Sequence, residues 1–248
     1  MSEHAGMVWR AVRPHGDRRT AARGLLLMLA IAVVAGCSSH GGGTAVAVPA
    51  AVRNSDSAPL PALTRPATGW NGWQPPSPTP KPNITLTDTA GQPFKLQVET
   101  RGVVTLFYMG YTHCPDACPT TMAELAHVLT ALPPAVANQI KVVFVTTDPA
   151  RDTPSVLRAW LGQFNPQFIG LTGSEQQIAQ LSQDVDMPPP QRQSGAGSAG
   201  YGVVHASVVW AFDRQDNLAH LLYPEGTSSG AFTHDLTRLV QAGWQASP

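Results

Sequence analysis

The residues best suited to chemistry lie in the stretch FYMGYTHCPDACPTTM, residues 107–122. It contains Cys114 and Cys118, separated by three residues, with His113 directly before the first cysteine. A thiolate can attack a disulfide or bind a soft metal ion, so this pair could be a redox switch, a metal clamp or a structural disulfide. A disulfide across so short a loop restrains little of the unfolded chain, which makes the purely structural reading the weakest.

Two prolines shape this stretch. Pro119 disfavours helical backbone angles at Cys118 and suits the first position of a helix, so we expect Cys118 to cap the following helix. Pro115 and Asp116 are typical of a tight turn, which predicts that the two cysteines face one another. Both sulfurs should then lie near a helix N-terminus, where the dipole and free N–H groups favour thiolates.

Strands and helices alternate around the cysteines. Residues 84–98 alternate polar and apolar positions around TAGQ and predict a hairpin, while residues 102–111 and 140–147 are apolar and β-rich, as buried central strands are. A helix follows the cysteines. The later predicted elements are helices over 153–164 and 174–185, capped by Thr153 and Ser174, a loop over 187–202, strands over 203–213 and 217–223, and a final helix over 229–244.

This order of elements indicates the fold class. A hairpin followed by β-α-β-α-α-β-β-α predicts a mixed central sheet with helices on both faces, in an α/β domain. A cysteine turn between a strand and a helix, with a late antiparallel strand pair, is the three-layer thioredoxin-like arrangement. Redox enzymes of that fold generally have two residues between their cysteines, and the third residue here lets the pair spread around a metal ion.

The histidines could add a further metal ligand. Two sulfurs suit Cu(I), and one imidazole would complete a three-coordinate site, whereas a closed zinc site needs four ligands. His205 follows a glycine-rich loop and enters an apolar strand, where a buried imidazole needs a partner. That pattern alone describes a core histidine more often than a ligand. His113 is interpreted as a polar turn residue, and nothing distinguishes the others in the predicted domain, His127, His220 and His234.

Residues 1–37 have the composition of a lipoprotein signal peptide. Five arginines precede the apolar run LLLMLAIAVVA, which is too short for a comfortable membrane-spanning helix and ends in Gly36 and Cys37. The letters VAGC resemble the bacterial lipobox, in which the cysteine is lipidated and becomes the new N-terminus. Cys37 is therefore the predicted lipid anchor. Plain secretory cleavage, which would leave Cys37 as a free thiol, is the alternative.

Residues 38–82 are rich in Ala, Pro, Ser, Gly and Thr and are interpreted as a flexible tether, with a reach on the order of 35 Å. Trp70 and Trp73 are unusual in a linker and would be explained by packing on the domain, which is assigned to residues 83–248. Removing residues 1–36 takes five of the 16 basic and two of the 16 acidic residues, leaving 11 and 14. This mildly acidic balance does not supply the excess of basic residues that is typical of nucleic-acid-binding proteins.

Three motifs closely resemble those of the Sco/SenC family, thioredoxin-fold copper proteins tied to assembly of the copper centre of cytochrome c oxidase. YTHCPDACPTT resembles the family's cysteine motif, VTTDPARDTPSVLRAW its aspartate–proline segment and FIGLTGS a further signature. With His205 they cover most of residues 84–245, in order. The resemblance implies that Cys114, Cys118 and His205 bind copper, as Cu(I) or Cu(II).

The resemblance also bears on neighbouring residues. It links Asp148 to the copper or redox site, where the carboxylate could orient a ligand or add a hard oxygen contact, although a cap or turn residue before Pro149 explains it as well. Asp152 is expected to brace Arg151 or the start of a helix. Family members commonly have an aspartate directly before the histidine, where this chain has Val204. Losing that charge is expected to alter Cu(II) affinity or partner docking.

The resemblance implies a copper chaperone that delivers copper to a cytochrome c oxidase subunit. Such a protein would be exported and held by its lipid at the outer face of the bacterial cytoplasmic membrane. The alternative function is a thiol-disulfide oxidoreductase that keeps the acceptor's cysteines reduced, with Cys114 and Cys118 as the catalytic pair. The two functions differ at His205, which only the chaperone requires.

Overall fold

A computed structural model describes residues 63–64, 69–194 and 200–245. The expected signal peptide with Cys37, and most of the expected tether, lie outside these ranges. None of the helices in the described ranges has the length and apolar character needed to cross a membrane.

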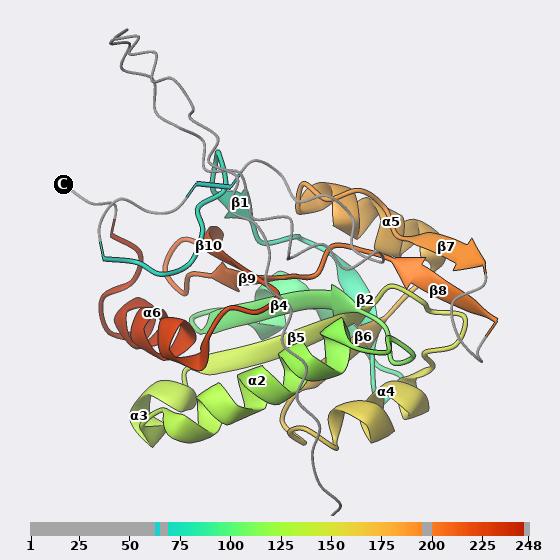
Figure 1. Ribbon diagram of the computed structural model, residues 1–248, viewed down its shortest axis with the longest axis horizontal. Helices are drawn as coiled ribbons and strands as arrows, with labels where there is room; N and C mark the ends of the chain where they lie inside the picture. Colours follow the sequence, from blue (N-terminus) through green and yellow to red (C-terminus); the bar gives the residue numbers. More distant parts are fainter. Residues whose placement is uncertain (1–62, 65–68, 195–199, 246–248) are drawn as a thin grey trace, which may run out of the picture. The chain divides into compact units, whose positions relative to one another are not determined.

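The domain is built on an eight-stranded mixed sheet with the order β1-β10-β9-β4-β5-β6-β2-β3 (Figure 1). Its middle strands, β4 (Val104–Gly110) and β5 (Ile140–Thr146), run parallel, and every residue of β4 is buried, as expected for an apolar strand covered on both faces. The other strands are β1 (Thr79–Pro80), β2 (Thr85–Asp88), β3 (Pro93–Lys95), β6 (Ile169–Thr172), β9 (Val208–Phe212) and β10 (Leu218–Pro224). Strands β2 and β3 form the predicted hairpin.

Helices cover both faces of this sheet. On one face, α2 (Ala117–Ala131), α4 (Pro154–Leu161) and α6 (Ser229–Ala242) contribute to a core that includes Tyr108 and Phe144. On the other face, α1 (Leu96–Glu99) and α5 (Glu175–Asp184) contribute to a core around Phe107 and Val143. A short helix, α3 (Pro134–Ala137), follows α2. The predicted three-layer, thioredoxin-like architecture is therefore confirmed.

Two helices begin where the sequence predicts. Thr153 is the N-cap of α4, with Pro154 at the first helical position, and its hydroxyl accepts a hydrogen bond from the backbone N–H of Val156. Ser174 and Gln177 form a reciprocal capping box at the start of α5. These side chains satisfy N–H groups that have no acceptor within the helix.

The sequence did not predict the short or polar strands. Strand β6 has four residues, and a two-stranded ribbon of β7 (Gln191–Ser194) and β8 (Tyr201–Val204) replaces the expected loop. All four β7 residues are polar and exposed, so no apolar alternation marks the strand. The single strand expected over 203–213 is divided, because β8 ends and β9 begins on either side of residues 205–207. His205 therefore lies where the chain passes from the ribbon to the main sheet.

Residues 69–82 are part of the folded domain. The backbone N–H of Trp73 donates to the carbonyl of Leu222 at 2.8 Å, and Trp70 stacks on Trp244 with ring centroids 5.0 Å apart. The boundary expected between residues 82 and 83 therefore falls inside the domain. The polar, proline-rich composition of residues 69–82 resembled that of a linker. The two tryptophans nevertheless supply apolar surface that the domain covers, and Trp70 is buried.

Candidate metal centre

The structure brings together the three side chains that the resemblance singled out. The ligand atoms of Cys114, Cys118 and His205 all lie within 4.8 Å of one another, and no other group of this kind occurs in the described ranges. Bonds of about 2.3 Å from a metal to sulfur allow two sulfurs on one ion to be roughly 4.6 Å apart. One ion can therefore reach all three atoms with small side-chain movements, and two sulfurs with an imidazole are a donor set that suits copper.

The cysteine loop connects β4 to α2. Helix α2 begins at Ala117 with Asp116 as its N-cap, so Cys118 lies in the first turn, and the prediction that it caps the helix is wrong. Pro119 is tolerated there because the first-turn N–H groups have no helical acceptor. The expected role of the helix N-terminus holds, since the backbone N–H of Cys118 lies 3.4 Å from the sulfur of Cys114 in hydrogen-bonding geometry.

The two sulfurs lie in different surroundings. Cys118 is fully buried, whereas Cys114 is partly exposed. At Gly110 the end of β4 comes so close to Cys118 that a Cβ atom there would lie 2.8 Å from the sulfur. The hydroxyl of Tyr108 donates to the same sulfur at 3.7 Å. A glycine and a tyrosine of one strand thus define the wall against which Cys118 packs.

These surroundings separate the acidities of the two thiols. The hydrogen bond from the Cys118 side chain, with smaller contributions from His205 and from the backbone of Cys118 and Asp116, lowers the pKa of Cys114 from 9.0 to about 4, against the opposing effect of burial. Burial raises the pKa of the Cys118 thiol well above its ordinary value, and the neighbouring Cys114 adds to this rise. The sequence predicted that both cysteines are thiolates. While no metal is bound, this holds at neutral pH for Cys114 only.

This separation predicts how the reduced, metal-free protein reacts with iodoacetamide. Because only the thiolate is nucleophilic, the alkylation rate at Cys114 should reach half its maximum near pH 4, while Cys118 stays protected at neutral pH. Mass spectrometry of peptides separates these sites from Cys37 and measures each rate. A rate at Cys114 that rises mainly between about pH 8 and 9, as for an ordinary thiol, would contradict this assignment.

His205 faces Cys118 from the other side of the site. Its side chain is buried, with Nε2 3.6 Å from the sulfur of Cys118 and Nδ1 3.1 Å from the carbonyl oxygen of Ala206. With its proton on Nδ1, the imidazole donates to that carbonyl and turns the lone pair of Nε2 toward the sulfurs. The rings of Tyr108 and Tyr111 contact it edge-on, with centroids 6.2 and 5.7 Å away.

Asp148 lies outside this group of three and contacts the ribbon instead. The carboxylate accepts a hydrogen bond from the hydroxyl of Tyr201 at 2.9 Å and forms an ion pair with Arg151. Arg151 also donates to the carbonyl of Tyr201 at 3.1 Å and stacks on its ring. These contacts connect the loop after β5 to β8, which ends one residue before His205. The sequence analysis did not identify Tyr201 as part of the site. The one indication was its position as an aromatic residue in a Gly/Ser-rich stretch.

Asp152 holds the cysteine loop. The sequence predicted that Asp152 braces Arg151 or the start of a helix, whereas Arg151 forms an ion pair with Asp148. The fully buried carboxylate of Asp152 accepts hydrogen bonds from the backbone N–H and the hydroxyl of Thr112, at 2.9 and 2.6 Å, and from the hydroxyl of Thr146 at 2.7 Å. Asp152 therefore fixes the backbone two residues before the first cysteine.

Replacing Asp152 with alanine should destabilise the domain. The change leaves one backbone N–H and two hydroxyls without their acceptor, so we expect a loss of about 3 kcal/mol of unfolding free energy in urea. Asp184→Ala, which removes an exposed carboxylate from α5, is the matched control and should change it by less than about 0.5 kcal/mol. Equal stabilities of the two variants would contradict the anchoring role.

The other histidines of the described ranges lie outside the three-residue group. The Nδ1 atom of His113 is 3.1 Å from the hydroxyl of Thr112, consistent with a polar turn residue. His220 is buried against the ring of Trp244 and close to Asp216, while His127 and His234 are exposed. None of them brings a further ligand to the sulfurs.

The fold and the Cys–Cys–His group define a thioredoxin-like protein with a candidate metal site. A family model described as SCO1/SenC matches residues 76–241, more than half of the chain. The chain belongs to the SCO1/SenC family.

Individual relatives agree with this assignment. A putative copper-binding protein of Stutzerimonas stutzeri is 35% identical over 149 residues, which cover 60% of this chain and 67% of that protein. An SCO2-like protein of Rickettsia felis is 36% identical over 132 residues, 52% of this chain and 62% of that protein. The chain thus spans about two thirds of the length of these relatives.

Solved structures show the same fold. Apo Sco1 of Thermus thermophilus is 29% identical with a TM-score of 0.59, over 68% of this chain and 95% of that chain. Copper-bound ScoI of Bradyrhizobium japonicum is 27% identical with a TM-score of 0.53, over 66% of this chain and 98% of that chain.

Proposed function

We propose that this protein is a copper chaperone that holds one copper ion through Cys114, Cys118 and His205 and passes it to a copper-site subunit of cytochrome c oxidase. The observation that carries the proposal is the assembled group of two sulfurs and one imidazole in a chain of the SCO1/SenC family. Copper in the Bradyrhizobium japonicum structure supports it. The oxidase as destination follows from the family resemblance.

The unequal exposure of the ligands suits release as well as binding. Cys118 and His205 are buried, while Cys114 is partly exposed, so an incoming thiolate or imidazole of the acceptor can approach beside Cys114. The ion can then exchange one ligand at a time. Copper binding must displace the proton of the Cys118 thiol, and release returns it, so affinity should rise with pH.

Copper transfer tests this function directly. The copper-loaded protein is mixed with the metal-free soluble domain of the oxidase subunit, and copper is quantified in each protein after separation. We expect one copper ion per molecule to move. If a copper salt loads the oxidase domain but this protein does not, the chaperone function is ruled out.

The thiols also support the alternative function of a thiol-disulfide oxidoreductase. The thiolate of Cys114 is accessible, and the protonated, buried Cys118 lies close behind it. Cys114 would attack the acceptor's disulfide and release one acceptor thiolate. Cys118 would then lose its proton and attack Cys114, which releases the second thiolate. The acceptor is reduced, this protein carries the new disulfide, and an external dithiol reductant must regenerate it.

We further propose that Cys37 anchors the exported protein by a lipid at the outer face of the bacterial cytoplasmic membrane. The support is the lipobox-like VAGC after an apolar run. A donor tethered beside a membrane acceptor gains effective concentration without tight binding. Mass spectrometry of the mature protein should show a lipidated Cys37 as the N-terminus, and an unmodified N-terminus elsewhere would contradict the anchor.

Asp148 is proposed to position His205 through Tyr201 instead of binding copper. Tyr201→Phe removes the hydroxyl that donates to Asp148. We expect faster hydrogen exchange of the β8 amides in the metal-free protein and a Cu(II) affinity about tenfold lower. Unchanged exchange in Tyr201→Phe, combined with an altered copper spectrum in Asp148→Asn, would indicate direct ligation by Asp148.

A further inference from the structure

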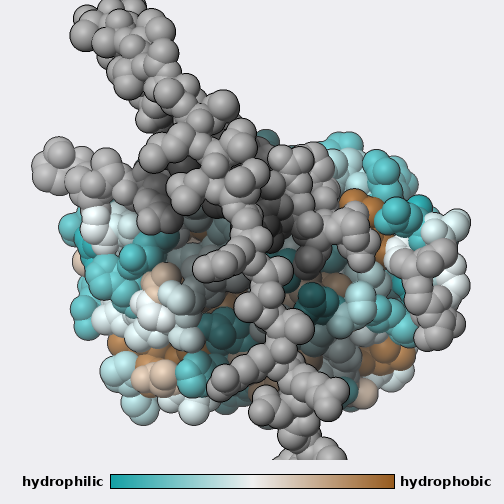
Figure 2. Space-filling model, in the orientation of Figure 1, coloured by the Kyte–Doolittle hydropathy of each residue, from teal (hydrophilic) through white to brown (hydrophobic). Residues whose placement is uncertain are grey.

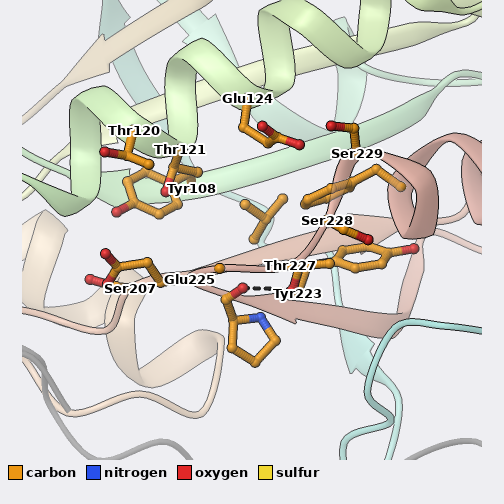
Figure 3. A pocket seen from close by; sticks show the side chains of 14 residues that line it. Tyr108, Thr120, Thr121, Glu124, Ser207, Tyr223, Glu225, Thr227, Ser228 and Ser229 are labelled. Carbon is orange, nitrogen blue, oxygen red and sulfur yellow. Dashed lines mark hydrogen bonds between the residues drawn. The ribbon is translucent and has the colours of Figure 1, made fainter. Parts of the chain in front are cut away.

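A pocket of about 310 Å³ opens beside the metal centre, between α2, α6 and the strands β9 and β10 (Figure 3). Eight of its fourteen described lining residues are serine, threonine or tyrosine. Among the described residues, the lining contains two charged ones, Glu124 of α2 and Glu225 directly after β10, and no basic one. Figure 3 shows these two glutamates on opposite sides of the pocket.

One carboxylate oxygen of Glu124 has no hydrogen-bond partner in the described part of the chain. This Oε1 atom is shielded from solvent, yet accepts no hydrogen bond. A carboxylate oxygen left in this state is destabilising, and a charged donor in the pocket would relieve it once the Glu124 side chain turns toward that donor. Two hydroxyls near the start of α6 make other hydrogen bonds. Thr227 donates to the carbonyl of Pro224, and the hydroxyl of Ser228 accepts from the backbone N–H of Ala231.

The pocket shares a wall with the metal centre. Tyr108 lines the pocket and donates its hydroxyl to the sulfur of Cys118 at 3.7 Å. Ser207, which also lines the pocket, follows His205 by two residues. A group bound in this pocket therefore lies next to the residues that would hold copper.

The rest of the surface offers little for apolar docking. In Figure 2, hydrophobic residues form only small, separate areas on the visible face of the domain. Val98 is the one large apolar side chain that is exposed among the described residues, at 49%. The described surface therefore offers a partner mainly polar and charged contacts.

We propose that this pocket receives a lysine or arginine side chain of the copper acceptor and thereby aligns the acceptor with Cys114. The proposal rests on the proposed chaperone function for the identity of the acceptor. Two carboxylates disfavour an anion, and the pocket's carboxylates form no group of three ligands for a metal ion. A side-chain cation satisfies both the negative charge and the unpaired oxygen of Glu124.

The first experiment needs no knowledge of the acceptor. The protein is titrated with N-acetylated, C-amidated Gly-Lys-Gly and Gly-Arg-Gly, with Gly-Gln-Gly as the neutral control, and amide shifts are followed by NMR. We expect shifts at pocket residues such as Thr120, Gly226 and Ser229, and an affinity at least about fivefold lower in the variant Glu124→Gln/Glu225→Gln. The same shifts with Gly-Gln-Gly, or none with the cationic peptides, would overturn the proposal.

The second experiment uses the metal-free copper-site domain of the oxidase subunit. At low salt the double variant should bind it about tenfold more weakly than wild type, and the difference should shrink as salt rises. Glu99→Gln, an exposed change outside the pocket, should bind like wild type. Copper affinity should be equal in all three proteins. Binding of the double variant within twofold of wild type would overturn the docking role.

The two experiments separate the pocket from the proposed function. If the cationic peptides bind but the oxidase domain binds neither wild type nor variant, the pocket is a docking site for a cationic side chain and the proposed acceptor is wrong. If the peptides do not bind while copper still moves to the oxidase domain, the chaperone function stands and the pocket proposal fails.

Discussion

Replacing Cys118 with serine should abolish tight copper binding. Loss of an outer hydrogen-bond partner typically lowers metal affinity by about 10- to 100-fold, and loss of a direct ligand should exceed this. Cys118 is fully buried, so water cannot readily replace its sulfur, and a serine hydroxyl is a poor donor to a soft ion. Competition with a chromophoric Cu(I) chelator measures the expected fall of more than about 100-fold.

Cys37→Ser provides the matched control for this prediction. It is the same chemical change at a cysteine outside the predicted domain. Copper affinity of the purified protein should be unchanged. If Cys118→Ser binds Cu(I) within about tenfold of the control, the buried sulfur is not a ligand. Because both proposed functions need Cys118, this variant tests the site without choosing between them.

His205→Ala should separate the two functions. Two thiolates still suit Cu(I), whereas Cu(II) prefers nitrogen and oxygen donors, so we expect Cu(II) affinity to fall by more than about 100-fold and Cu(I) affinity by less. Reduction of a disulfide substrate should continue, since Cys114 and Cys118 remain. Copper competition assays and disulfide turnover on the same preparation measure both effects.

His220→Ala is the control for loss of a buried imidazole. His220 stacks on Trp244 and pairs with Asp216, away from the sulfurs, so its loss should leave affinity for both copper ions unchanged. If His205→Ala behaves like His220→Ala toward Cu(I) and Cu(II), the three-ligand site is wrong. If it also stops disulfide turnover, His205 acts on the thiols themselves.

The parts of the fold that the sequence predicted well are those with strong local signals. The apolar runs of β4 and β5 and the caps Thr153 and Ser174 specify their elements through neighbouring residues alone. Strand β7 could not be predicted in this way, because its four polar residues become a strand only through pairing with β8. The tether was assigned too far along the chain because composition does not show that Trp70 finds a partner in Trp244.

The candidate site likewise has one part that local sequence predicts and one part that depends on the fold. The pairing of Cys114 and Cys118 follows from their spacing, but His205 is 87 residues from Cys118, and only the passage from ribbon to sheet brings them together. Before the structure, family resemblance alone indicated that contact. The separation of the two thiol pKa values could not be predicted either, since it depends on burial of one sulfur against Gly110 and Tyr108.

X-ray absorption spectroscopy of the copper-loaded protein tests the central claim most directly. The proposed site predicts two sulfurs and one imidazole nitrogen around copper in the wild-type protein. His205→Ala should lose the multiple scattering of the imidazole and keep both sulfurs. A wild-type spectrum without sulfur, or identical imidazole scattering in the wild-type protein and His205→Ala, would contradict binding through Cys114, Cys118 and His205.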